Sequence, residues 1–241
     1  MIPYHRASGS HPVLAGTRAV VTTRSRFAED RLALAADRGV DQYVILGAGL
    51  DSFAYRSGLG SRVRVFEVDA PATQQWKRQK LSTEGIEPVC DLTFVSLDLR
   101  GESVVERLAA AGFSTDRPAF VSWLGVSFYL DAESVAAALA ALSSLAPGSE
   151  LVMDYVVPPE LRDEGGQAYA GFAMPVAESS GEPWKSAFTP PNMERLLYEN
   201  AFETLEHVGQ RDCVEPSLWQ RSDALQPIGL WMAVRAVRRG P

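Results

Sequence analysis

The stretch from Gln42 to Asp51 constrains the fold more than any other part of this chain. It reads Gln-Tyr-Val-Ile-Leu-Gly-Ala-Gly-Leu-Asp, so a short apolar run ends in two glycines separated by one residue. A buried parallel strand that enters a tight turn, with a helix beginning after it, has this pattern. Glycine has no Cβ, so a ligand can approach the backbone of such a turn closely. We therefore expect an α/β fold with a cofactor site on the turn.

Strand-like and helix-like segments alternate along most of the chain. The expected strands are residues 43–46, 63–68, 92–97, 119–124, 150–157, 202–208 and 229–237. The expected helices are residues 17–38, 73–81, 103–111, 132–145 and 193–200. Such alternation predicts an α/β fold of the Rossmann-like, doubly wound kind, with a mostly parallel seven-stranded sheet and helices on both faces.

Two segments stand apart from this alternation, although residues 1–241 read as a single domain. Residues 1–38 are expected to form an N-terminal arm followed by a helix. Residues 158–192 are rich in proline and glycine, which is typical of a loop or lid with short helical pieces. The aromatic side chains in this segment favour a packed lid over a substrate site rather than a disordered linker.

Arg24 lies on the same face of the expected N-terminal helix as the apolar residues Val20 and Phe27. An inward-pointing guanidinium group needs an anion beside it. Periodicity alone favours a structural salt bridge at Arg24 and leaves a bound anion as the alternative.

Composition excludes several classes of partner. The chain has a net charge of −7, so it has no general attraction for phosphate backbones, and we expect no nucleic-acid partner. Cys90 and Cys213 are too few for a disulfide framework or a zinc cluster, so we expect no metal site and a reduced, cytoplasmic protein. The first ten residues lack the apolar core of a signal peptide, and no apolar run approaches the roughly 18 residues of a membrane span. The oligomeric state stays open, with a homodimer as one alternative.

Acidic residues mark the ends of the second and third expected strands. Glu67 and Asp69 lie at the end of the strand 63–68, and Asp98 follows the strand 92–97. Ligands of open α/β sheets bind at the carboxyl ends of the strands, where an acid accepts hydrogen bonds from ribose hydroxyls. Asp69 suits that role, and Asp98 is placed to reach an adenine amino group. Helix capping would explain one acid alone, but the set favours a nucleoside cofactor.

The residue at position 52 separates two kinds of cofactor. The dinucleotide fingerprint has a third glycine where Ser52 stands, which argues against a nicotinamide-dependent oxidoreductase but leaves it as an alternative. The chain has no Gly-Lys-Ser/Thr at the turn, so a P-loop is excluded.

Three motifs carry a resemblance to a known family. Residues 47–56 read Gly-Ala-Gly-Leu-Asp-Ser-Phe-Ala-Tyr-Arg, residues 65–71 read Val-Phe-Glu-Val-Asp-Ala-Pro, and residues 97–100 read Leu-Asp-Leu-Arg. With the stretches 122–130 and 181–190, they resemble the leucine carboxyl methyltransferase family of class I S-adenosylmethionine-dependent methyltransferases, in its bacterial small-molecule branch. The resemblance covers roughly residues 20–237, and the first motif with its trailing Tyr-Arg is its most specific part.

The resemblance implies a set of residues that hold S-adenosyl-L-methionine. These are Arg24, Gly47, Ala48, Gly49, Asp51, Glu67, Asp69, Asp98, Leu99, Trp123 and Leu124. Among them, Arg24 would bind the methionyl carboxylate, Asp69 the ribose, and Asp98 with Leu99 the adenine. The family often has a glutamate where Leu124 stands, so this contact is lost here or is made by a backbone carbonyl. This departure keeps a non-catalytic cofactor-binding protein open as an alternative.

The sequence thus leads to the hypothesis of an O-methyltransferase that acts on a carboxylate or hydroxyl of a small molecule, as in secondary metabolism. The aromatic lid suggests an apolar acceptor, and Tyr129, Asp154, Tyr155 and Trp184 are the candidate substrate residues. No catalytic residue is assigned, because a carboxylate acceptor is already ionised and needs no general base. His207 is expected to have a surface role.

Overall fold

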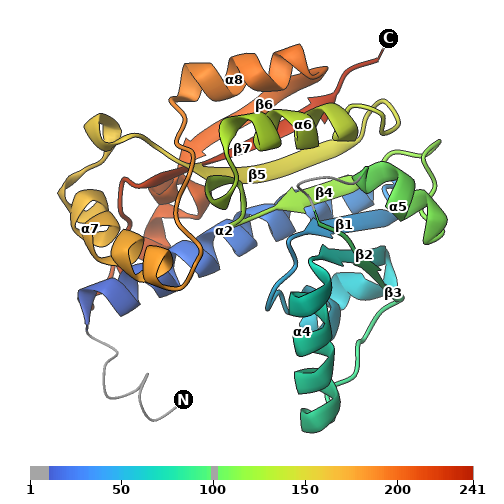
Figure 1. Ribbon diagram of the computed structural model, residues 1–241, viewed down its shortest axis with the longest axis horizontal. Coiled ribbons are helices and arrows are strands. Elements are labelled where there is room, and N and C mark those ends of the chain that lie inside the picture. Colours follow the sequence, from blue (N-terminus) through green and yellow to red (C-terminus); the bar gives the residue numbers. More distant parts are fainter. Residues whose placement is uncertain (1–10, 99–102, 241) are drawn as a thin grey trace.

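A computed structural model describes residues 11–98 and 103–240 of the chain (Figure 1). Seven strands form one sheet in the order β3-β2-β1-β4-β5-β7-β6. The strands are β1 (Gln42–Leu46), β2 (Arg64–Asp69), β3 (Leu92–Ser96), β4 (Phe120–Trp123), β5 (Glu150–Val156), β6 (Phe202–Gly209) and β7 (Trp231–Arg238). Strands β1 to β5 pair in parallel, and β7 lies antiparallel between β5 and β6. The predicted mostly parallel, seven-stranded sheet is confirmed.

Helices cover both faces of the sheet, as the alternation predicts (Figure 1). The helices are α2 (Pro12–Asp37), α3 (Phe53–Arg56), α4 (Pro71–Glu84), α5 (Val104–Ala110), α6 (Ala132–Leu142), α7 (Glu164–Ser179) and α8 (Pro190–Glu199). One core lies between the sheet and α5, α6 and α8, and the other lies between the sheet and α2, α3 and α7. Because both faces are covered, every residue of β1, β4 and β5 is buried, which explains their nearly continuous apolar sequences.

The switch in strand order places a crevice beside β1. Strand β1 lies between β2 and β4, so the chain crosses from one side of β1 to the other after β3. In open α/β sheets, ligands bind outside the carboxyl ends of the strands at such a point. The turn that begins at Gly47 leaves β1 at this place.

Helix α2 begins earlier than the sequence predicts. It starts at Pro12 rather than near residue 17, with proline in its first turn and an extended His11 before it. Proline is favoured there because its fixed φ suits a helix and its missing N–H is not needed in the first turn. The helix therefore has 26 residues and begins more than one turn before its predicted start.

The segment 158–192 contains a longer helix than the short pieces expected from its glycines and prolines. Helix α7 has 16 residues and includes Pro175. It begins where the carboxylate of Asp163 accepts the backbone N–H of Gly166 at 2.6 Å. A Cβ at Gly166 would overlap the carbonyl of Gly229, so glycine permits a close contact rather than breaking the helix. The division of the chain into arm, domain and lid stays a prediction.

Candidate functional site

The two glycines of the turn have different surroundings. Both have positive φ, 66° at Gly47 and 43° at Gly49, a conformation that favours glycine. A Cβ at Gly47 would overlap the side chain of Val126, so this glycine allows the loop after β4 to pack on the turn. A Cβ at Gly49 would meet no described atom nearer than 3.8 Å, the carbonyl oxygen of Gly47. Gly49 is thus the position at which a ligand can reach the backbone. Ala48 is buried and offers only its backbone to a ligand.

The carboxylates of Asp69 and Asp51 fix the backbone around the turn. Asp69, the last residue of β2, accepts the N–H of Gly49 with one oxygen and the N–H of Ala70 with the other, the latter at 2.7 Å. Asp51 accepts the N–H of Phe53 at 2.7 Å, and burial raises the pKa of the Asp51 carboxyl. Each oxygen of Asp69 keeps a further lone pair, which a ribose hydroxyl can use.

Glu67 and Lys77 form a buried ion pair beneath the turn. Glu67 is 1% exposed, and the Nζ of Lys77 donates to its Oε2 at 2.6 Å and to the carbonyl oxygen of Asp51 at 2.8 Å. The other oxygen of Glu67 has no hydrogen-bond partner among the described residues. Burial raises the pKa of Glu67 to about 7 despite the opposing effect of Lys77. In this position the side chain of Glu67 supports the turn, and its role toward the cofactor stays a prediction.

Three other predicted cofactor residues, Asp98, Trp123 and Leu124, lie at the neighbouring strand ends. Asp98 is half-buried just after β3, whereas Leu99 lies outside the described residues. Trp123 is fully buried, and its indole N–H has no partner among the described residues. The side chain of Trp123 therefore belongs to the core, and the predicted cofactor contact at this position would come from its backbone. Leu124 is partly buried and packs on the core beside α2.

Arg24 and Asp154 join α2 to β5 beside the turn. The Nη1 of Arg24 lies 3.2 Å from Oδ2 of Asp154, whose other oxygen accepts the N–H of Gly125 at 2.6 Å. Gly125 has a φ of 73°, and a Cβ there would overlap the guanidinium group of Arg24. The salt bridge that periodicity favours is thus present. Gly125 was not predicted as a site residue, although its place directly after β4 was a signal for it.

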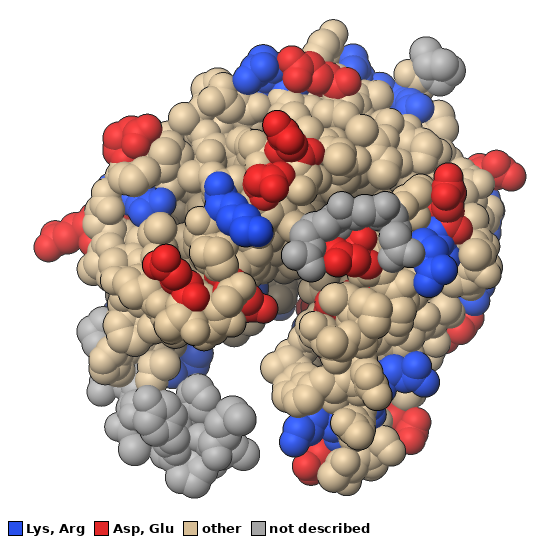
Figure 2. All heavy atoms as spheres, viewed as in Figure 1, with Lys and Arg blue, Asp and Glu red and all other residues tan. Residues whose placement is uncertain are grey.

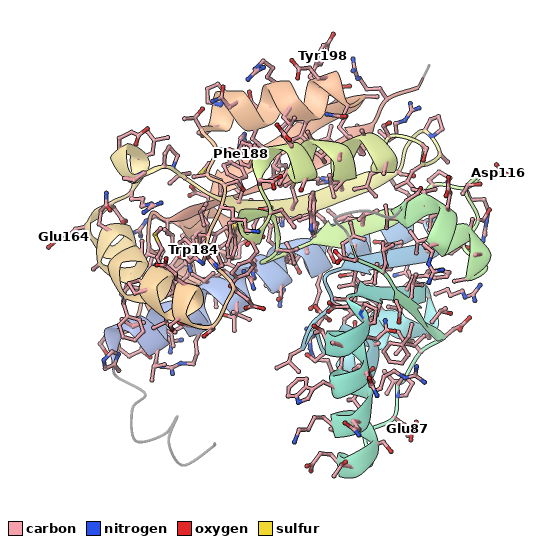
Figure 3. The ribbon with its side chains drawn as sticks, viewed as in Figure 1. Glu87, Asp116, Glu164, Trp184, Phe188 and Tyr198 are labelled. Atoms are coloured by element: carbon pink, nitrogen blue, oxygen red, sulfur yellow. The ribbon has the colours of Figure 1, made fainter. Side chains whose placement is uncertain are left out.

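A cavity of about 400 Å³ extends from Arg24 and Gly125 to the gap between α2 and α7. Three of the four predicted substrate residues, Tyr129, Asp154 and Trp184, line it. Trp184, labelled in Figure 3, lies between α7 and the sheet, and its ring centroid is 5.1 Å from that of Phe128. Burial is the main cause of a raised pKa at Tyr129. Figure 2 shows that this face is hollowed between the part that carries α7 and the part that carries α4.

Most of the cavity wall is apolar and comes from two helix faces. The contributing residues are Val13, Leu14, Val20 and Val21 of α2, and Phe172, Ala173, Val176 and Ala177 of α7. The two helices are joined by the hydroxyls of Thr17 and Tyr169, which lie 3.1 Å apart. Periodicity identified the apolar face of α2, but no pattern in the sequence indicated that α7 would lie opposite it.

Tyr155 lies on the other face of the sheet. Successive residues of a strand point to opposite faces, so Asp154 and Tyr155 cannot both line one cavity. The hydroxyl of Tyr155 is hydrogen-bonded to Nε2 of His207, whose Nδ1 lies 2.9 Å from Oε1 of Glu194. This arrangement corrects the expected substrate role of Tyr155. It also corrects the surface role of His207, whose side chain is 10% exposed.

In residues 11–98 and 103–240, no group of three or more His, Cys, Asp or Glu side chains is placed to hold a metal ion. No helix within these ranges has the length and apolar character needed to cross a bilayer.

Comparison with known sequences matches the chain to one family. A family model described as leucine carboxyl methyltransferase matches residues 3–143. A protein of Bacillus subtilis strain 168, provisionally named S-adenosyl-L-methionine-dependent methyltransferase YktD, is 36% identical over 203 residues, which are 83% of this chain and 66% of that protein. The matched stretches span only 44% to 66% of the length of the curated relatives compared.

Solved structures share the fold. A provisionally assigned methyltransferase from Thermobifida fusca YX has a TM-score of 0.67 and 23% identity, with 98% of this chain and 86% of that chain covered. Magnesium protoporphyrin IX methyltransferase from Synechocystis PCC 6803, solved with bound S-adenosylmethionine, has a TM-score of 0.54 and 16% identity, with coverages of 98% and 89%. At these identities the likeness shows a common fold.

Proposed function

Because the chain belongs to the leucine carboxyl methyltransferase family, we propose that it is an S-adenosylmethionine-dependent O-methyltransferase. The proposed acceptor is a small molecule with a carboxylate or a hydroxyl group, such as a secondary metabolite. One observation carries the proposal, namely that the cofactor turn and an apolar cavity meet. Val126 packs against Gly47 of the turn, and its neighbour Gly125 lines the cavity.

The residues around the turn fit an amino-acid nucleoside. Gly49 leaves open space at the backbone, Asp69 has free lone pairs for ribose hydroxyls, and Arg24 can pair with a carboxylate. Lys77, which lies under the turn, is already bound to Glu67 and is not placed for a phosphate. When bound, S-adenosylmethionine would supply a methyl group on a sulfonium, which is a strong electrophile.

The chain itself would contribute alignment and the exclusion of water. The apolar walls from α2 and α7 would hold the acceptor close to the turn and keep water out. Holding the two reactants in the right geometry lowers the barrier to methyl transfer. The aromatic faces of Tyr129 and Trp184 could favour a nearby cation by about 0.5–2 kcal/mol. A hydroxyl acceptor must also lose its proton, whereas a carboxylate has none to lose.

Calorimetric titration with S-adenosylmethionine and, separately, with NAD tests this proposal. We expect S-adenosylmethionine to bind and NAD to fail, and we expect Asp69→Ala to weaken S-adenosylmethionine binding at least about tenfold. Asp116→Ala is the matched control, since Asp116 is exposed and far from α7 and the cavity (Figure 3). Failure of S-adenosylmethionine to bind, or binding that Asp69→Ala leaves unchanged, would contradict the proposal.

A further inference from the structure

We propose that the cavity selects a neutral hydroxyl compound, an alcohol or a phenol, and discriminates against carboxylates. The inference rests on the proposed function, because it takes the cavity to be the acceptor site. The charged side chains of the cavity wall carry this inference, which leaves hydroxyl compounds and excludes carboxylates as the acceptor class.

Three charged side chains line the cavity among the described residues: Arg24, Asp154 and Glu182. Arg24 and Asp154 form an ion pair, and the side chain of Asp154 is 2% exposed. Together these two groups carry no net charge. Glu182 therefore gives the wall an excess of one negative charge.

Arg24 cannot serve an anionic acceptor without a cost elsewhere. The Nη1 of Arg24 must stay on the buried carboxylate of Asp154, which has no other described cation, so only the remaining N–H groups of Arg24 can meet another anion. Removing one partner of a buried pair leaves an uncompensated charge and is strongly unfavourable. Arg24 is also the residue proposed to hold the methionyl carboxylate. A second carboxylate would compete with the first for one guanidinium group.

Glu182 lines the cavity with an exposed side chain. It follows α7, and its backbone N–H donates to the carbonyl of Ala177 at 2.9 Å, which holds the residue at the end of the helix. After burial, the charge of Glu182 is the next cause of the raised pKa of Tyr129, which lines the same cavity. No hydrogen bond or ion pair links the carboxylate of Glu182 to another side chain in residues 11–98 and 103–240. An anion that enters the cavity would lose water and approach this negative charge, which solvent screens in part because Glu182 is exposed; both effects oppose binding.

A neutral hydroxyl meets none of these costs. The other polar side chains of the wall, among them Thr17, Tyr129, Tyr169 and Trp184, are neutral and include both donors and acceptors. A hydroxyl can donate and accept one hydrogen bond with such groups while its apolar body fills the space between α2 and α7. Glu182 is also available to accept the proton that a hydroxyl must lose when its oxygen is methylated.

Matched acceptor pairs test the inference by calorimetry, with S-adenosylhomocysteine present. The pairs are 2-naphthol with 2-naphthoate, and 1-decanol with decanoate, at a pH where the acids are ionised and the hydroxyls are neutral. We expect the hydroxyl compound of at least one pair to bind about tenfold tighter than its carboxylate. Glu182→Gln should reduce that ratio, and Glu182→Lys should reverse it.

The control is Glu164→Lys, which makes the same charge change at the first residue of α7, the helix that Glu182 follows. Glu164 is exposed and points away from the cavity (Figure 3), so the ratio should stay as in the unaltered chain. Equal or tighter binding of the carboxylates would overturn the inference. So would a ratio that Glu182→Lys leaves unchanged, or the failure of all four compounds to bind while S-adenosylmethionine still binds. Loss of S-adenosylmethionine binding itself would instead contradict the proposed function, so the two failures are distinguishable.

Discussion

The glycine turn and the cavity beside it are built in opposite ways. The turn is made of residues close together in the sequence, and its polar groups are tied to the backbone or to each other, as Asp69 is to Gly49 and Lys77 to Glu67. The cavity is made of segments far apart in the sequence, and most of its wall is apolar. The difference suggests that the turn tolerates little change without loss of stability, whereas the cavity can change its ligand at little cost.

The largest expected effect is at the buried ion pair under the turn. Lys77→Met leaves the carboxylate of Glu67 without a cation, and removing one partner of a buried pair costs about 3–5 kcal/mol. The effect depends on pH, because the pKa of Glu67 is raised to about 7 in the folded protein. Well below that pH, Glu67 is protonated and Lys77 is needed less. Denaturant unfolding at one pH below the pKa of Glu67 and one above it should show a larger loss of unfolding free energy at the higher pH. A loss of equal size at the two pH values would contradict this account. The double variant Lys77→Met with Glu67→Gln should recover much of the lost unfolding free energy.

Substitutions of the two glycines of the turn should differ in their effects on stability and on ligand binding. Gly47→Ala forces a Cβ into Val126 at a positive φ, and overpacking with backbone strain should cost about 2–3 kcal/mol. Gly49→Ala meets only the strain of its φ and should cost about 1 kcal/mol, but its Cβ would occupy the space open to a ligand. Thermal unfolding and calorimetric titration with S-adenosylmethionine measure both effects. If Gly49→Ala bound the cofactor normally, Gly49 would not be the point of approach.

A smaller effect is expected on the far side of the sheet. Tyr155→Phe removes the hydrogen bond to His207, which should cost about 1 kcal/mol. Because Tyr155 faces away from the cavity, binding of the naphthyl and decyl compounds should not change. A clear loss of their affinity in Tyr155→Phe, measured beside its unfolding free energy, would mean that the two faces are coupled.

The smallest effect on stability is expected in the cavity wall. Phe172 lines the cavity but is 51% exposed, so Phe172→Ala should change the free energy of unfolding by no more than about 1 kcal/mol. The same change removes apolar surface from the proposed acceptor site and should weaken binding of 1-decanol several-fold. Met174→Ala is the matched control, since Met174 is also partly exposed on α7 and does not line the cavity. Equal losses of 1-decanol affinity in Phe172→Ala and Met174→Ala would mean that the cavity wall has no special role in binding, and the comparison of turn and cavity would fail.

The sequence predicts the turn better than the cavity for a physical reason. Motif spacing reports local geometry, so Gly47, Gly49 and Asp69 could be placed together before the structure was seen. The alternation of β5 could also have separated Asp154 from Tyr155, because side chains on a strand change faces at every residue. The position of Glu182 beside Tyr129 depends on how α7 packs over α2, and tertiary packing of this kind leaves no spacing pattern in the sequence.

Helix α2 contributes to both regions, and this has a consequence for how the protein tolerates insertions. Five residues between positions 13 and 21 line the cavity, and Arg24, which also lines it, pairs with Asp154. One inserted residue between them would rotate the two parts of the helix relative to each other by about 100°. The apolar cavity wall of α2 and the guanidinium group of Arg24 could then no longer face the same side. The ligand preference of the cavity should therefore change through point substitutions in α2 rather than through insertions between these residues.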